Sequence, residues 1–336
     1  MKRQVVGIAA AMAAFMGCGP SSDDVGDPLG SWNEGGAKQS ILEFVESVID
    51  PASTAFAAPA ERIAVFDNDG TLWAEQPMYF QLAFAIDRVR ALSAEHPEWS
   101  DQDPFRTILS GDPDALGGLT EHDLVEIVTL THSGITTAEF RAVVADWLAT
   151  ARHPRFDRPY TELAYQPMLE LLDYLRANGF KTFIVSGGGI DFMRVFTEEV
   201  YGIPPEQVVG SVGKTTLETR DGRPVLVKQP GIDFIDDKEG KPIGIDRFIG
   251  RRPIAALGNS DGDLAMLQYT AAGPGAQLML YVHHDDAERE WAYDRESHIG
   301  RLDAGLDEAR ERGWTVVSMK NDWNRVFGFE DRGEGG

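Results

Sequence analysis

The chain has 336 residues, of which 43% are hydrophobic and 10% aromatic, and its formal net charge is −23 at pH 7. This apolar content is enough for a large buried core and excludes a wholly disordered chain. The negative charge repels nucleic acid and anionic membrane surfaces, so we expect no nucleic-acid partner.

The N-terminus has the pattern of an export signal. Two basic residues precede the apolar run VVGIAAAMAAFM at positions 5–16, which is short for a membrane-spanning helix and typical of a secretory signal. The run leads to Cys18, the single cysteine, in a setting that resembles a bacterial lipoprotein signal, although Phe15 stands where leucine is usual. We expect residues 1–18 to direct export to the periplasm or cell surface, with a lipid anchor on Cys18. The alternative is an ordinary secretory signal in which Cys18 is incidental.

Residues 19–37 are rich in Gly, Ser, Asp and Pro, and this composition predicts a flexible tether. The folded part is expected to begin at residue 38. In residues 40–50, apolar side chains recur at the i, i+3, i+4, i+7 spacing of a one-sided helix. The last residues, 328–336, are predicted to be a frayed tail.

Short apolar runs recur along the rest of the chain and predict buried strands at 63–66, 180–185, 207–212, 253–257, 277–282 and 314–319. Helical patterns lie between several of them. This alternation indicates an α/β fold with a Rossmann-like parallel sheet covered by helices on both faces. Residues 38–73 and 167–327 are assigned to this core.

The segment between the first two predicted strands, residues 74–166, contains helical patterns and is predicted to be an all-helical cap. One of its helices follows Thr136, which is spaced from Glu139 as in a capping box. A cap inserted after the first core strand lies over the carboxyl edge of the sheet, where open α/β sheets bind ligands. A second interruption, residues 213–230, contains Asp221-Gly222 and predicts a local hairpin flap.

The sequence DNDGT follows the first predicted strand and contains Asp67 and Asp69. An EF-hand calcium loop is a poor fit, because Gly70 is only the fourth residue and Met78 stands where the final glutamate is required. A surface turn is the other simple interpretation, since Asp, Asn and Gly favour turns. The position at the ligand edge of the sheet favours a functional site instead.

Three other segments carry residues suited to the same site. Ser186 begins the sequence SGGG after a strand, and a hydroxyl with open backbone N–H groups before a helix can bind an anion. A lysine, Lys238 or Lys241, precedes a short helix. The sequence GNSDGD follows a further strand, and its acidic residues need a compensating cation or partner.

In this order, the four segments resemble the motifs of the haloacid dehalogenase superfamily over about residues 62–285. Asp67, Asp69 and Thr71 match its first motif, DxDx(T/V), and Ser186 matches the second. The lysine matches the third. In the fourth motif, GDxxxD, Asn259 occupies the position of the first acid and Asp263 that of the second. The SGGG segment and the helical insertion look most like the phosphoserine-phosphatase branch.

The resemblance implies a role for each matching residue. Asp67 would attack phosphorus and form an aspartyl-phosphate, and Asp69 would act as general acid and base. Ser186 and the N–H of Gly187 would hold the phosphoryl oxygens, and the lysine would neutralise their charge. Mg²⁺ is the expected cofactor, held by Asp67, the Asp69 carbonyl and the fourth motif.

Two choices stay open within this resemblance. Asn259 can ligate the metal with Asp263 supplying charge nearby, which we favour, or the turn shifts and Asp261 ligates directly. Lys241 is preferred to Lys238, because Lys241-Pro242 looks like a helix start.

Four further side chains lie in or near these motifs. Thr71 and Glu75 are assigned to substrate binding, with Thr71 also supporting the loop. The neighbouring His283 and His284 point in opposite directions on an extended segment, so they are not expected to bind one metal together.

The sequence therefore predicts a Mg²⁺-dependent phosphomonoester hydrolase acting on a small phosphorylated metabolite, such as a phosphoserine-like or phosphocholine-like ester. One alternative is a phosphotransferase or phosphomutase that uses the same aspartyl-phosphate. The other is a non-catalytic lipoprotein that binds phosphate esters, which Asn259 in the fourth motif would favour.

Overall fold

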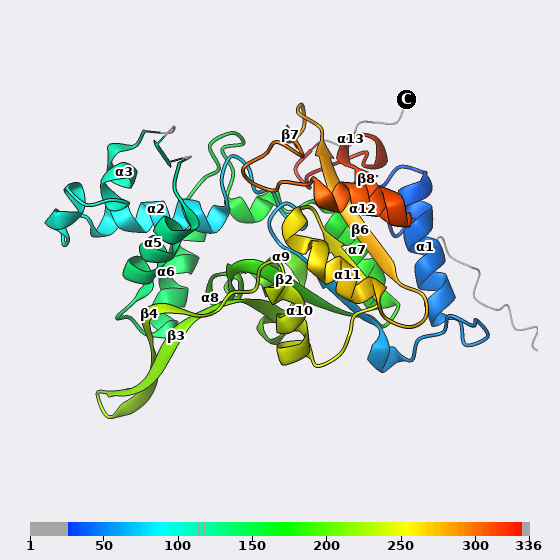
Figure 1. Ribbon diagram of the computed structural model, residues 1–336, viewed down its shortest axis with the longest axis horizontal. Helices are drawn as coiled ribbons and strands as arrows, with labels where there is room; N and C mark the ends of the chain where they lie inside the picture. Colours follow the sequence, from blue (N-terminus) through cyan, green and yellow to red (C-terminus); the bar gives the residue numbers. More distant parts are fainter. Residues whose placement is uncertain (1–25, 113–114, 117, 331–336) are drawn as a thin grey trace, which may run out of the picture.

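The computed structural model describes residues 26–330, apart from 113–114 and 117 (Figure 1). The predicted signal, with Cys18, lies outside the described residues. Within the described part of the chain, no helix has both the length and the apolar character needed to cross a membrane.

The centre of the fold is a mostly parallel sheet, as predicted. Its strands are β1 (Ile63–Phe66), β2 (Lys181–Gly189), β3 (Val208–Arg220), β4 (Arg223–Phe234), β5 (Ala255–Gly258), β6 (Leu278–Asp285), β7 (Ala292–Tyr293) and β8 (Thr315–Ser318). They lie in the order β4-β3-β2-β1-β5-β6-β7, and β8 pairs with β6. Strands β3, β2, β1, β5, β6 and β8 are parallel, whereas β4 and β7 are antiparallel to their neighbours. The carboxyl end of β1 is therefore flanked by those of β2 and β5.

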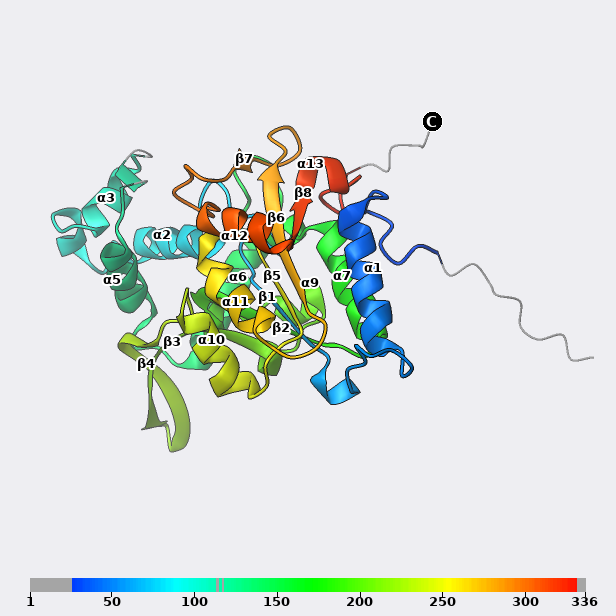
Figure 2. The ribbon, with the colours of Figure 1, turned by 45° about the vertical axis from the view of Figure 1, so that its right-hand side comes forward.

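Helices cover both faces of this sheet (Figure 2). One face carries α1 (Gly36–Ile49), α7 (Gln166–Ala177) and α9 (Thr197–Tyr201), and the other α10 (Gly240–Gly244), α11 (Leu264–Ala271) and α12 (Ala304–Arg312). Every residue of β1 is buried: Ala64 and Phe66 belong to the first apolar cluster, Ile63 and Val65 to the second. This two-sided burial explains why the strand is a continuous apolar run. Two short helices, α8 (Ile190–Met193) and α13 (Met319–Asp322), follow strand ends.

The cap lies to one side of the sheet and contains the predicted helices (Figure 1). Its described helices are α2 (Phe80–Leu92), α3 (Phe105–Ser110), α5 (Glu121–His132) and α6 (Thr137–Thr150). The capping box at the start of α6 is present: Thr136 Oγ1 accepts from Glu139 N, and Glu139 Oε2 accepts from Thr136 N. A small apolar cluster that includes Trp99 and Phe105 gives the cap a core of its own.

The described elements between β1 and β2 are all helices, in agreement with the predicted helical cap, and the predicted hairpin packs against this cap. The expected hairpin exists, with Asp221 and Gly222 both at positive φ between β3 and β4. It is not an isolated flap, because Val227 of β4 forms a β-bridge with Thr136 of the cap. The backbone of Gly134 donates to Lys228 O at 2.9 Å. An exposed strand edge needs hydrogen-bond partners, and the loop before α6 supplies them here.

The predicted tether is wrong for residues 26–37. Leu29 and Trp32 are buried in the main core, and Trp32 Nε1 donates to Pro167 O at 2.9 Å. Composition indicated a loop, but two large apolar side chains are enough to fix it against the core. The predicted tail also starts too early, since Phe329 stacks on Phe327 with ring centroids 5.0 Å apart. Residues 331–336 lie outside the described part of the chain.

Candidate active site

The DNDGT loop is shaped by its backbone at the end of β1. Asp67 N donates to Leu257 O on β5 at 2.9 Å, and the carbonyl of Asn68 accepts from Leu72 N at 2.8 Å. Gly70 has φ of +73°, and a Cβ there would overlap the side chain of Asn259. A glycine is therefore required at this position, both for its conformation and for the close approach of the fourth motif.

Lys241 lies at the centre of the site and is 2% exposed. Its Nζ donates to Asp67 Oδ1 at 2.7 Å, to Asp263 Oδ1 at 2.6 Å and to Val185 O at 2.9 Å. These three bonds use all three donors of the ammonium group. Burial alone would lower the pKa of Lys241, but the two carboxylates outweigh it and raise the pKa. Lys241, rather than Lys238, is thus the lysine whose ammonium reaches Asp67.

The two aspartates of the loop have different surroundings. Burial raises the pKa of Asp67, Asp263 adds to this rise, and Lys241 opposes it. Burial also raises the pKa of Asp69, to about 6, against a hydrogen bond from Trp73 Nε1 to its Oδ1 at 2.8 Å. A carboxyl group with a pKa close to neutral can both give and take a proton, which general acid–base catalysis requires.

Asp261 and Asp263 of the fourth motif face in different directions. Asp263 Oδ2 accepts from the backbone N–H groups of Asn259, at 2.9 Å, and Ser260, at 3.0 Å, while its other oxygen binds Lys241. Asp261 Oδ1 instead accepts from the backbone of Asp303 and Gly305 at 2.9 and 2.8 Å, at the start of α12. Asp261 therefore holds α12, and Asn259 is the side chain that faces the DNDGT loop.

Asn259 is held between Thr71 and Glu75. Thr71 Oγ1 donates to Asn259 Oδ1 at 3.0 Å, and Asn259 Nδ2 donates to Glu75 Oε1 at 2.7 Å. Thr71 is fully buried and Glu75 is 2% exposed. Both side chains therefore contact Asn259, and their assignment to substrate binding stays a prediction.

The glycine-rich end of β2 contacts the cap. Ser186 is buried, its Oγ accepts from Gly188 N at 3.2 Å, and Gly187 beside it is exposed. Gln81, in the first turn of α2, accepts from Gly189 N at 2.7 Å. The sequence had not indicated Gln81, because a single glutamine in a predicted helix carries no signal of its own.

Two acidic residues before Lys241 were also missed. Asp236 is fully buried, and this burial raises its pKa to about 7. Asp237 lies between the second and fourth motifs, close to Gly187 and Gly262, and burial raises its pKa too. The acidic pair next to a lysine was visible in the sequence, but only the lysine had a counterpart in the family pattern.

The two neighbouring histidines diverge, as predicted. His284 is buried, with Nε2 2.8 Å from Gly70 O and Nδ1 3.2 Å from Glu290 Oε2. His283 faces Asp294, with Nε2 3.4 Å from its Oδ2. His284 therefore supports the DNDGT loop from behind.

The oxygen atoms at the site fit a hard divalent cation. Among residues 26–330 without the three undescribed positions, no three His, Cys, Asp or Glu side chains are grouped to hold a metal. The expected set contains only one such ligand, Asp67, together with the Asp69 carbonyl and the Asn259 amide oxygen. Burial raises the pKa of Asp67, Asp69 and Glu75, because it disfavours the ionised form of each carboxyl group, and a bound cation would oppose this effect. A Mg²⁺ ion with water completing its shell matches this set.

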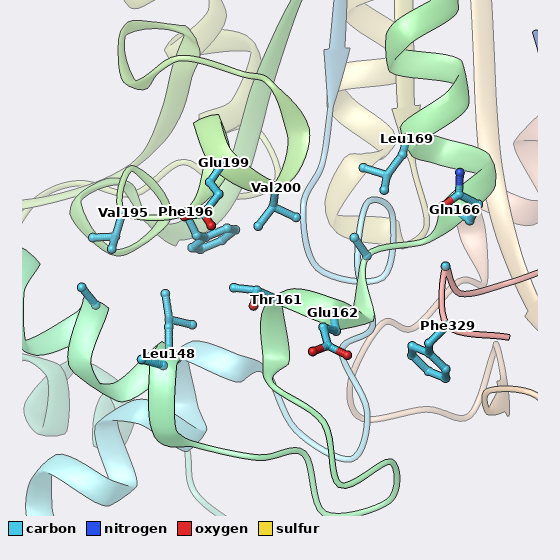
Figure 3. Close-up of a pocket in the computed structure, with 14 residues that line it drawn as sticks. Leu148, Thr161, Glu162, Gln166, Leu169, Val195, Phe196, Glu199, Val200 and Phe329 are labelled. Carbon is cyan, nitrogen blue, oxygen red and sulfur yellow. The ribbon is translucent and has the colours of Figure 1, made fainter.

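A separate cavity of about 680 Å³ lies between α6, α7 and α9 (Figure 3). Its wall combines apolar residues such as Leu148, Val200 and Phe329 with polar residues such as Glu162 and Glu199. None of the predicted catalytic residues lines it. Phe196 also belongs to this wall and stacks on Trp73 with ring centroids 4.3 Å apart, so the cavity lies behind the indole that contacts Asp69.

The fold and site together define a class of hydrolase with an aspartate at the end of the central strand. Asp67, Asp69, Lys241 and Asn259 converge there from three separate segments, as the motif order required. The family model for haloacid dehalogenase-like hydrolases matches residues 64–268, and the chain belongs to this family.

Solved structures with the same fold include proteins of unknown function. The chain is 16% identical to one from Bordetella pertussis Tohama I, covering 77% of this chain and 99% of that one with a TM-score of 0.50. It is 20% identical to a protein of unknown function from Anaerococcus prevotii DSM 20548. The match covers 83% of this chain and 91% of that one, with a TM-score of 0.52. A phosphoserine phosphohydrolase-like protein from Francisella tularensis subsp. tularensis SCHU S4 is more distant, with 14% identity to this chain. The match covers 75% of this chain and 99% of that one, with a TM-score of 0.37. No curated protein matches the chain.

Proposed function

We propose that this hydrolase is a Mg²⁺-dependent phosphatase for small phosphate monoesters and that Asp67 is its nucleophile. The observation that carries the proposal is the ion pair between Asp67 and Lys241, with Asp69 two residues further on in the same loop. In this arrangement Lys241 holds Asp67 in one orientation. A second carboxyl group of suitable pKa lies within the same loop.

The chemistry needs two steps. Asp67 attacks phosphorus, so that an aspartyl-phosphate bond forms and the bond to the leaving alcohol breaks, while Asp69 gives its proton to the departing oxygen. Asp69 then takes a proton from water, the water attacks phosphorus, and inorganic phosphate leaves with Asp67 restored. Lys241 neutralises charge on Asp67 and on the transferring group, and Ser186 with the Gly187 N–H holds phosphoryl oxygens. When bound to Asp67, the Asp69 carbonyl and Asn259, Mg²⁺ would supply further charge neutralisation.

The surroundings of the site support an ester with a cationic leaving group. Burial raises the pKa of Tyr79, and the nearby carboxyl groups of Glu75 and Asp69 add to this rise. Asp237 adds another carboxyl group beside the loop of the second motif. Aromatic rings and carboxylates attract ammonium groups, so phosphoserine-like and phosphocholine-like esters are the substrates to test first.

The decisive experiment is a phosphate-release assay on a panel of monoesters, with EDTA or Mg²⁺, for wild type and Asp67→Asn. We expect wild-type turnover that needs Mg²⁺, and a loss of at least about 10³-fold in Asp67→Asn. Asp246→Asn, at an exposed position, is the matched control and should keep full activity. Unchanged activity in Asp67→Asn would overturn the mechanism. Phosphate transfer to an added alcohol would indicate a phosphotransferase, and tight ester binding without turnover a non-catalytic binding protein.

Export and lipid anchoring concern residues 1–18 and remain part of the proposal. The apolar run and Cys18 support them. Mass spectrometry of the mature protein checks both. We expect wild type to begin at a lipid-modified Cys18, and Cys18→Ser to lose that modification and its membrane association. An identical mature mass and location in both would contradict anchoring.

A further inference from the structure

The chain that follows Ser186 contains three consecutive glycines, at positions 187–189, and then enters α8. Because glycine has many allowed backbone conformations, this glycine segment does not by itself fix the directions of its N–H groups. Neighbouring side chains restrain it. Ser186 Oγ accepts from Gly188 N at 3.2 Å, and Ser211 Oγ donates to Gly187 O at 2.8 Å. The geometry that the segment offers to a phosphoryl group therefore depends on such contacts.

Two further contacts hold the glycine segment from the side of the cap. Gln81 of α2 accepts from Gly189 N at 2.7 Å. Asp191, two residues later in the first turn of α8, forms an ion pair with Lys228 of β4, with 2.5 Å between Oδ2 and Nζ. The side chains of Lys228 and Asp191 are 9% and 18% exposed, so solvent ions screen this pair only weakly. The ion pair thus restrains the backbone just after the glycines.

Lys228 also contacts the cap directly. Its backbone N donates to Ile135 O, and its carbonyl accepts from Gly134 N, both at 2.9 Å. Its Nζ lies 4.7 Å from the ring centroid of Phe140 on α6, which is a cation–π contact. The hairpin of β3 and β4 lies beside the cap helices α5 and α6 (Figure 1). A single buried lysine of the hairpin therefore joins the cap to the end of the glycine segment.

We infer that Lys228 is a positioning residue for phosphate binding, which orders the glycine segment and so the phosphate-holding groups of Ser186 and Gly187. It acts through its ion pair with Asp191 and does not need to touch the substrate. The restraint reduces the conformational freedom that the segment would otherwise lose when a phosphoryl group binds. Preorganised donors bind an anion more tightly for this reason. The inference rests on the proposed role of Ser186 and Gly187.

The affinity for inorganic phosphate tests this inference on the whole folded protein. It is measured by isothermal titration calorimetry at one saturating Mg²⁺ concentration. Lys228→Met keeps the apolar stem and removes the charge, and we expect phosphate binding about 10-fold weaker than in wild type. Its Mn²⁺ affinity should stay within about 2-fold of wild type, because the expected metal ligands lie in other segments. Lys214→Met, at an exposed position of the same hairpin, is the matched control and should bind phosphate like wild type.

A second variant tests whether the ion pair carries the effect. Asp191→Asn breaks the pair from the other side and should weaken phosphate binding by a similar factor. The double variant Lys228→Met/Asp191→Asn should then bind phosphate about as weakly as Lys228→Met alone, whereas independent effects would multiply to about 100-fold. A lysine that only stabilises the fold predicts a lower melting temperature with unchanged phosphate affinity, or equal losses of phosphate and Mn²⁺ affinity.

The outcomes separate this inference from the proposed function. Unchanged phosphate affinity in Lys228→Met, an equal loss of Mn²⁺ affinity, or multiplied losses in the double variant would overturn the role of Lys228 and leave the phosphatase proposal intact. Neither phosphate binding nor ester turnover by the wild type would overturn both. If Lys228→Met fails to fold, Asp191→Asn decides: weaker phosphate binding with wild-type Mn²⁺ affinity supports the inference, and wild-type affinity for both contradicts it.

Discussion

The hydrogen bond from Trp73 to Asp69 allows a quantitative test of the acid–base assignment. Trp73 Nε1 donates to Asp69 Oδ1 at 2.8 Å and favours the ionised carboxylate, whereas burial favours the neutral form. A hydrogen bond to a charged group contributes about 1.5–3 kcal/mol. Asp69 is partly exposed, so the lower end of this range applies. Since about 1.4 kcal/mol corresponds to one pKa unit, Trp73→Phe should raise the pKa of Asp69 from about 6 by about one unit.

The assay is the single-turnover rate of aspartyl-phosphate formation as a function of pH. Asp69 must carry a proton to assist an alkyl leaving group, so the rate falls as the pH rises through its pKa. In Trp73→Phe we expect this fall to occur about one unit higher for an alkyl phosphate such as phosphoserine. A nitrophenyl phosphate is the internal comparison, because nitrophenolate leaves without a proton and its rate should depend much less on Asp69.

Phe196→Leu is the matched control for this prediction. It removes the stacking partner of Trp73 but keeps the indole N–H that binds Asp69. Its pH profile should therefore coincide with that of wild type. An unshifted profile in Trp73→Phe, or an equal shift in Phe196→Leu, would refute the reasoning.

Three further predictions concern stability. Lys241→Met removes the cation between two buried carboxylates, so urea denaturation should show a loss of about 3–5 kcal/mol in the free energy of unfolding; an unchanged midpoint would contradict this. The pKa values of Asp67 and Asp69 are raised from 3.8 to about 8 and about 6, so the folded state binds more protons than the unfolded state above pH 3.8. The metal-free protein therefore loses stability as pH rises from 3.8, and the loss is complete at about pH 6 for Asp69 and about pH 8 for Asp67. The increase in melting temperature on adding Mg²⁺ should then grow between about pH 5 and about pH 8, and an increase independent of pH would argue against a cation at these carboxylates. Gly300→Ala should destabilise more than Gly313→Ala, because both have positive φ but only the first Cβ meets other atoms; equal melting temperatures would count against the packing around Glu75.

Much of the fold followed from the sequence because strand and helix patterns are local. The continuous apolar run of β1 reflects burial on both faces, and it was read correctly from four residues. The proximity of Asp67, Ser186 and Asn259 was also predictable, since each follows a predicted strand and parallel strands end at one edge of a sheet. The predicted tether failed for the opposite reason: the burial of Trp32 depends on Pro167, which is far away in the chain.

The sequence by itself determined the alternation of strands and helices along the chain and the capped α/β class, and it predicted which residues would carry phosphoryl chemistry. Only the tertiary structure decided between neighbouring candidates, because residues one or two positions apart can face opposite directions. Asp261 turns to the start of α12, whereas Asn259 turns to Thr71 and Glu75. The contacts of Glu75 were equally hidden, since they depend on two glycines and Tyr293 that meet it only in the folded chain.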